Sequence, residues 1–121
     1  MREPSPKRKR TLALQECTCA VQLVRAADSA SNNLVEADDA VSDADFLNKM
    51  GIALRETKES RTELMKVRLG NLDNHQKTAR LELESEATEL TAIFSTIIRN
   101  MRWRIEGERT KRKGGSQPPK P

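Results

Sequence analysis

The chain has 121 residues, of which 36% are hydrophobic and 33% are charged, and its aromatic residues are two Phe and one Trp. This length predicts one small domain, because a chain so short rarely holds two hydrophobic cores. Many Ala, Leu, Glu, Lys and Arg residues favour helices and exclude a strand-rich sandwich or barrel. No apolar stretch approaches the roughly 18 residues of a membrane span, and the first ten residues lack the apolar region of a signal peptide. We therefore expect a cytoplasmic protein with no membrane partner.

The net charge of +4 is distributed unevenly along the chain. Residues 1–10 carry +4 and residues 102–121 carry +5, whereas residues 11–101 carry −5. Both ends contain Pro, and the second also contains two adjacent Gly, so we predict disordered basic tails over residues 1–10 and 106–121. Such tails bind RNA or DNA through phosphate charge, although basic ends can equally serve only to keep a protein soluble. The candidate nucleic-acid contacts are Lys7, Arg8, Lys9, Arg10, Arg102, Arg104, Arg109, Lys111, Arg112 and Lys113.

The stretch from about residue 11 to residue 36 predicts a first amphipathic helix. Its apolar stripe repeats at steps of three and four through Leu14, Cys17, Val21 and Val24. The polar residues after position 27 weaken the helix, because short polar side chains compete for backbone hydrogen bonds, so we predict a bend or fray near Ser31.

Two further helices are predicted over residues 42–70 and 75–105. The second begins at a capping pattern, Ser42 followed by Asp45, and stops at Gly70. The third has an apolar seam at heptad-like spacing, made by Leu83, Ala87, Leu90, Phe94, Ile97 and Met101. Short connections make neighbouring helices antiparallel, so residues 11–105 are predicted to form an all-α, up-and-down bundle. Because its core is thin, we expect the chain to form oligomers.

The residue types that carry chemistry are sparse. His75 is the only histidine, and it is expected in an inter-helix turn. Cys17 and Cys19 are two residues apart, so on a helix they point to different faces and do not favour a shared ion or a disulfide. No Glu-x-x-His motif, P-loop or nucleophile elbow occurs. We therefore expect no enzymatic activity, no metal site and no cofactor.

The string from Gln22 to Ala37 resembles a motif of the bacterial four-helix bundle protein family, in which Gln-Ile-Arg-Arg-Ala is followed by Ser-Ile-Pro and Asn-Ile-Ala-Glu-Gly. Residues 45–60 are similar to the family's Phe-x-x-Lys helix, and residues 89–94 to its Glu-Leu-x-x-Ile segment. The family includes proteins encoded in intervening sequences of the large-subunit ribosomal RNA gene, and it is similar to accessory proteins of diversity-generating retroelements. The matching motif positions are Gln22, Arg25, Ala26, Ser29, Asn33 and Glu36.

The resemblance implies a homopentamer of helical bundles, with binding of nucleic acid and of a reverse transcriptase in the retroelement relatives. Compared with that family, the chain is expected to lack the first helix, which leaves a groove open. Ser31 and Ala37 stand where the motif has Pro and Gly, and Thr62 and Glu63 stand where relatives often carry an aromatic pair. Arg25 could face a ligand or a neighbouring subunit, or it could form a structural ion pair with a carboxylate that fixes helix register.

These observations support two functional hypotheses. The first is a non-enzymatic oligomeric protein of the intervening-sequence or retroelement accessory type that binds nucleic acid through its basic ends. The second is an interaction module that binds a partner helix in the open groove without contacting nucleic acid.

Overall fold

The computed structural model describes residues 5–67 and 72–121, and within α1 it describes side chains from Thr18 onward. Three helices make up the fold: α1 (Pro6–Asp38), α2 (Asp43–Val67) and α3 (Asn74–Arg112). No strand occurs among the described residues. The predicted all-α helical bundle is confirmed, and no described helix is long and apolar enough to cross a membrane.

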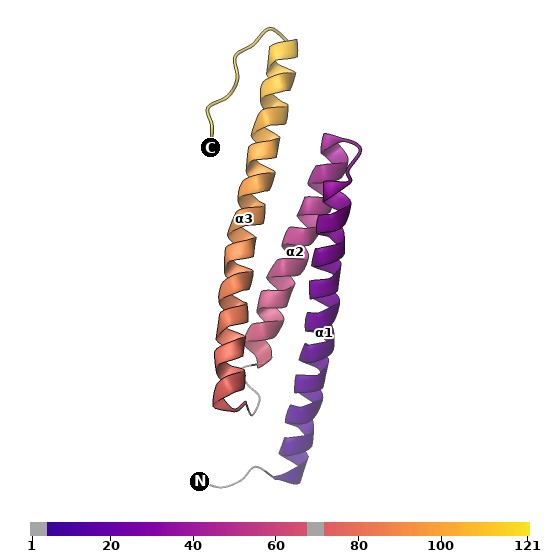
Figure 1. The fold of residues 1–121 in the computed structure, drawn as a ribbon, viewed down its shortest axis with the longest axis vertical. Coiled ribbons are helices and arrows are strands. Elements are labelled where there is room, and N and C mark those ends of the chain that lie inside the picture. Colours follow the sequence, from indigo (N-terminus) through magenta and orange to yellow (C-terminus); the bar gives the residue numbers. More distant parts are fainter. Residues whose placement is uncertain (1–4, 68–71) are drawn as a thin grey trace.

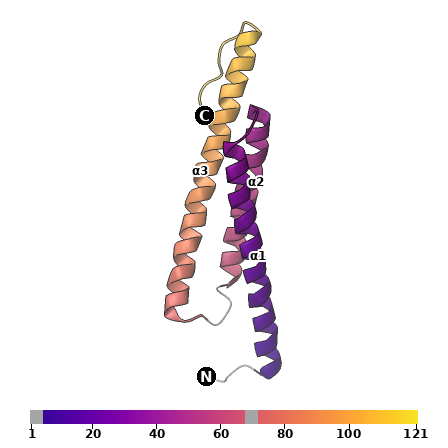
Figure 2. The same ribbon diagram turned by 45° about the vertical axis from the view of Figure 1, so that its right-hand side comes forward.

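The three helices alternate in direction, and α2 lies between the other two (Figure 1). α1 and α2 pack along their length as a hairpin, and α3 packs against α2. In the described residues no Cα atom of α1 lies within 8 Å of one in α3. The α1 and α3 backbones therefore do not pack closely, and in the turned view the two helices diverge toward the start of α3 (Figure 2).

Side-chain caps explain where α2 and α3 begin. The Asp45 N–H donates to Ser42 Oγ at 3.0 Å, which fits the capping pattern predicted from the sequence. At α3, the Gln76 N–H donates to Asp73 Oδ1 at 2.7 Å and the Asp73 N–H donates to Gln76 Oε1 at 3.0 Å. This reciprocal box starts α3 at Asn74, so His75 lies in its first turn and not in a loop. The predicted stop at Gly70 lies outside the described residues.

The core is small and lies toward the end of the bundle that holds the α1–α2 turn. Its buried centre is Ala37, Met50, Phe94 and Ile98, with Leu34, Phe46, Leu47 and Leu54 packed around it. Along the α1–α2 seam the closest-packed residues are Ala26 and Ala53, both fully buried. Small side chains let two helix backbones approach each other, which explains why this seam closes with little apolar volume.

Two predicted apolar stripes are only partly buried. Val21 and Val24 of α1 are 60% and 61% exposed, because the buried face of the helix is instead the one that carries Ala26, Ala30 and Ala37. On α3, Ala87 and Phe94 are buried, but Leu83 and Leu90 remain 54% and 39% exposed. Leu83 and Leu90 remain exposed because no described part of the α1 backbone packs closely against α3. α1 itself runs unbroken past Ser31, so the predicted fray is wrong.

Both predicted tail boundaries need correction. α1 begins at Pro6, so Lys7–Arg10 are helical, because Pro is tolerated in the first turn where its missing N–H has no partner to lose. Residues 1–4 of the predicted N-terminal tail lie outside the described residues. At the other end α3 continues to Arg112, seven residues beyond the expected limit of 105.

The C-terminal tail, predicted to be disordered, folds back along α3. Gly114 has a φ of 78°, and the N–H groups of Gly114 and Gly115 donate to Lys111 O and Thr110 O at 3.0 and 2.9 Å. This is a Schellman turn, which reverses the chain. The Trp103 indole then donates from Nε1 to Pro118 O at 2.7 Å, and Lys120 Nζ lies 5.9 Å from the Trp103 ring centroid. The Gly and Pro residues predicted only that the helix ends, and the indole donor that anchors the tail was not predicted from the sequence.

Candidate functional site

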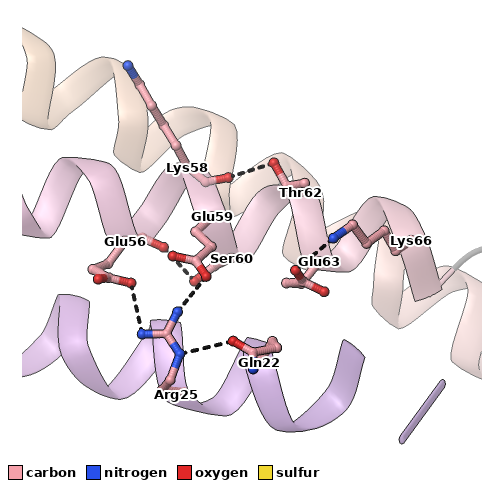
Figure 3. Close-up of polar contacts among 9 residues, drawn as sticks. All are labelled: Gln22, Arg25, Glu56, Lys58, Glu59, Ser60, Thr62, Glu63 and Lys66. Carbon is pink, nitrogen blue, oxygen red and sulfur yellow. Dashed lines mark hydrogen bonds and ion pairs between the residues drawn. The ribbon is translucent and has the colours of Figure 1, made fainter. Parts of the chain in front are cut away.

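Charged side chains meet between α1 and α2 in a group that we call the Arg25 cluster, made by Gln22, Arg25, Glu56 and Glu59 (Figure 3). The Arg25 guanidinium donates through Nη2 to Glu59 Oε1, and its Nη1 lies 3.6 Å from Glu56 Oε2. Its Nε donates to Gln22 Oε1 at 3.0 Å, one turn earlier on the same helix. One side chain of α1 is thus directed at two carboxylates of α2.

The contact between Arg25 and Glu59 favours the charged form of both groups. The hydrogen bond from Arg25 lowers the pKa of the Glu59 carboxyl, and the same contact raises the pKa of Arg25. Glu56 is 8% exposed, and its Oε2 has no hydrogen-bond donor among the described residues. Its negative charge is therefore balanced mainly by the nearby guanidinium. Arg25 forms the structural ion pair that the sequence left as one of two alternatives, and it lies in the seam that sets how α1 and α2 align.

The remaining motif positions also lie within the α1–α2 hairpin. The Asn33 side chain donates from Nδ2 to Ser29 O at 2.8 Å. Glu36 pairs with Lys49 of α2, with Oε2 and Nζ 2.6 Å apart, and this contact raises the pKa of Lys49. The polar motif residues thus brace α1 or join it to α2.

The candidate reactive groups are His75 and the two cysteines. His75 is exposed in the first turn of α3. Burial and the adjacent Glu63 carboxylate raise the pKa of the free Cys19 thiol, which is the opposite of what an activated thiolate nucleophile needs. Cys17 is among the residues whose side chains are not described. The described residues contain no group of three His, Cys, Asp or Glu side chains placed to hold a metal.

The basic segments lie at opposite ends of the elongated bundle (Figure 1). The last turns of α3 project beyond the α1–α2 turn, past the point where Arg104 Nη2 lies 3.4 Å from Asp43 Oδ1. Arg109 approaches Glu106 at 3.9 Å. The other candidate contacts in this segment are exposed and form no ion pair with any described residue: Arg102, Lys111, Arg112 and Lys113. Lys7–Arg10 belong to the first turns of α1, where side chains are not described.

A groove of about 450 Å³ runs between α1 and α3. Its walls are residues from Leu23 to Leu34 of α1 and from Leu83 to Phe94 of α3, and Thr57, Ser60 and Leu64 of α2 form its floor. Glu86 is the one charged residue in this lining. The resemblance implied an open groove, and the structure has one on the face where α1 and α3 are apart.

The sequence did not identify the partners of Arg25 on α2, because they lie more than 30 residues away along the chain. Glu56, Glu59 and Glu63 repeat at steps of three and four and so share one helix face. Two of them, Glu56 and Glu63, are buried. A row of carboxylates on one face of a helix with few large apolar residues could have predicted a charged interface.

Comparisons with known proteins agree with the fold. A family model described as 23S rRNA-intervening sequence protein matches residues 9–96. Neither the curated proteins nor the solved structures contain a match. The matched stretch covers well over half of the chain, including most of α1, all of α2 and α3 as far as Thr96. The chain belongs to the 23S rRNA-intervening sequence protein family.

Proposed function

We propose that this chain is a non-enzymatic, homo-oligomeric protein that binds nucleic acid through its basic helix ends. The observation that carries the proposal is the projecting end of α3, where Lys111, Arg112 and Lys113 are exposed and unpaired among the described residues, as is Arg102 just before it. Such side chains are available to phosphate groups, which supply most of non-specific nucleic-acid affinity. RNA is the first ligand to test, because the family is described by its connection to a ribosomal RNA gene.

Self-association is supported by the large apolar side chains that the single chain leaves in water. Val21, Val24, Val35, Leu81 and Ile93 are each more than half exposed. Burial of apolar surface favours association by roughly 25 cal/mol per Å². Because the core of one chain is small, apolar surface buried between chains would add substantially to the stability of the fold. A pentamer, the assembly that the family resemblance implies, is the arrangement we propose to test by size-exclusion chromatography with light scattering.

The nucleic-acid proposal is tested by fluorescence anisotropy with a labelled single-stranded RNA of mixed sequence, measured across a series of salt concentrations. The variant Lys111→Gln/Arg112→Gln/Lys113→Gln is expected to weaken binding and to reduce the slope of log affinity against log salt by about 2. The matched control removes three exposed cations of the bundle body, Arg55→Gln/Lys58→Gln/Lys77→Gln, and should leave the slope unchanged. Equal losses in the two variants would show that only net charge matters and would overturn the assignment to the end of α3.

A second function is favoured by a separate observation, the open apolar groove between α1 and α3. We propose that this groove binds a helix of another protein, with no nucleic acid involved. The two proposals use different parts of the molecule, so the loss of one binding activity should leave the other intact.

A further inference from the structure

The groove has the length and the shape of a helix-binding site. Its wall on α1 extends from Leu23 to Leu34 and its wall on α3 from Leu83 to Phe94. Each wall covers about three helical turns, or roughly 16 Å of helix axis. The lining is almost entirely apolar, so the face of an occupant that enters the groove must be apolar as well.

The walls of the groove carry mainly acidic residues. Between positions 81 and 98, α3 has four carboxylates and no basic residue: Glu82, Glu84, Glu86 and Glu89. Glu84 is paired with Arg80, whereas Glu86 lines the groove. Glu82 and Glu89 lie one helical turn before and one turn after Glu86.

The α1 wall adds one carboxylate. Between Leu23 and Leu34 the charged residues are Asp28 and Arg25, and the Arg25 guanidinium is directed at α2, where it is paired with Glu56 and Glu59. Asp28 lies one turn from Val24 and Ser31, both of which line the groove. The opening is thus bordered by negative charge on both sides, although the whole chain has a net charge of +4.

We propose, building on the second function above, that the groove binds a basic amphipathic helix of another protein. The apolar face of that helix enters between α1 and α3, and its Lys or Arg side chains extend over the wall carboxylates. Complementary charge favours this partner over an acidic or a neutral helix, because like charges placed along one interface oppose binding.

The experiment uses two labelled peptides of about 18 residues with Leu at the same helical positions. One has Lys and the other has Glu at the remaining positions, and each is titrated with the full chain by fluorescence anisotropy at low and moderate salt. The Lys peptide is expected to bind at least tenfold more tightly. Because the chain as a whole is positive, non-specific attraction would favour the Glu peptide instead.

Matched variants locate the binding site. Leu83→Gln/Leu90→Gln changes two exposed residues that line the groove, whereas Leu81→Gln/Ile93→Gln changes two exposed residues of the same helix that do not. All four side chains are 39% to 57% exposed, so the fold should survive both changes, as circular dichroism would verify. The first variant is expected to lose at least tenfold in affinity for the Lys peptide, and the second less than threefold.

Charge reversal tests the wall carboxylates. Glu86→Lys/Glu89→Lys is expected to bring the affinities for the two peptides together or to invert their order. The control Asp39→Lys/Glu108→Lys makes the same change in net charge away from the groove and should preserve the preference for the Lys peptide.

Each other outcome identifies what fails. If neither peptide binds, the helix-binding function itself is wrong. If both bind the groove equally, that function stands and the basic partner is wrong. If light scattering shows a dimer that the Leu83→Gln/Leu90→Gln change dissociates, a second copy occupies the groove and the proposal is overturned.

Discussion

The two sides of α2 are built in contrasting ways. Toward α1 it presents Ala53 and a row of carboxylates, and the seam is closed by small residues and by Arg25. Toward α3 the contact is held mainly by Phe94 and Ile98 at one end, and the remaining seam opens into the groove. Small and charged side chains thus hold the closed interface of this bundle, whereas much of its apolar surface is left for other contacts.

The largest expected effect comes from removing the Phe94 side chain, which packs α3 into the core. Phe94 is 6% exposed within the core cluster, so Phe94→Ala leaves a cavity that few neighbours can fill. Losses of about 3 kcal/mol or more in the free energy of unfolding are typical of such changes, a large part of the stability of a small domain. Urea denaturation measures it. Ile93→Ala, at a position that is 52% exposed, is the control and should cost under about 1 kcal/mol.

Removal of Arg25 tests the polar seam. Arg25→Gln leaves Glu56 buried without its compensating charge, and an unpaired buried carboxylate opposes folding. We expect a lower Tm, by less than Phe94→Ala causes, and we expect part of the loss to be recovered in Arg25→Gln/Glu56→Gln. If the single and the double variant had the same Tm, the Arg25–Glu56 attraction would contribute nothing to the seam.

A smaller effect, the pH dependence of the same seam, follows from the lowered pKa of Glu59. A carboxyl group whose pKa is lower in the folded than in the unfolded state stabilises the fold at pH values above its ordinary pKa, near 4.5. That contribution is lost as the pH falls through the lowered value. The Tm difference between the wild type and Glu59→Gln should therefore be largest near pH 7 and shrink below about pH 4.5. A constant difference across this range would contradict the assigned ion pair.

The sequence predicts much of this fold because helix starts and periods are local properties. Ser42 with Asp45 marked the beginning of α2, and the seam through Ala87 and Phe94 marked the side of α3 that meets its neighbour. The buried face of α1 was not predictable in the same way. Val21 and Val24 are more hydrophobic than Ala26 and Ala30, but close approach of two helices selects the small residues.

The candidate site depends on contacts between residues distant in sequence. Arg25 was singled out from its motif, but its partner Glu59 lies 34 residues later, and no local pattern pairs the two. Trp103 likewise finds its acceptor 15 residues later, after a chain reversal. Periodicity identifies the faces of helices, whereas the pairs that join those faces depend on the assembled fold.

The smallest expected effect concerns the tail at the end of α3. In Gly107→Ala the new methyl group would lie 2.5–2.8 Å from the Gln117 side chain, so that side chain must shift, and we expect the tail that carries it to loosen. Ala favours the helix over Gly by about 1 kcal/mol, and this gain offsets the cost of disturbing the tail. We therefore expect the free energy of unfolding to change little. The readout is the fluorescence of Trp103, the only Trp of the chain, whose emission should shift to longer wavelength as Pro118 and Lys120 withdraw.

Gly51→Ala provides the matched control for this change. No atom lies within 4 Å of the added methyl group in α2, so the helix should gain a similar stability while Trp103 emission stays the same. Unchanged emission in Gly107→Ala would mean that the Gln117 side chain turns aside while the tail keeps its contacts with Trp103. A shift in Gly107→Ala alone would assign Gly107 to the fold-back, because close approach of the tail is the feature that distinguishes it from Gly51.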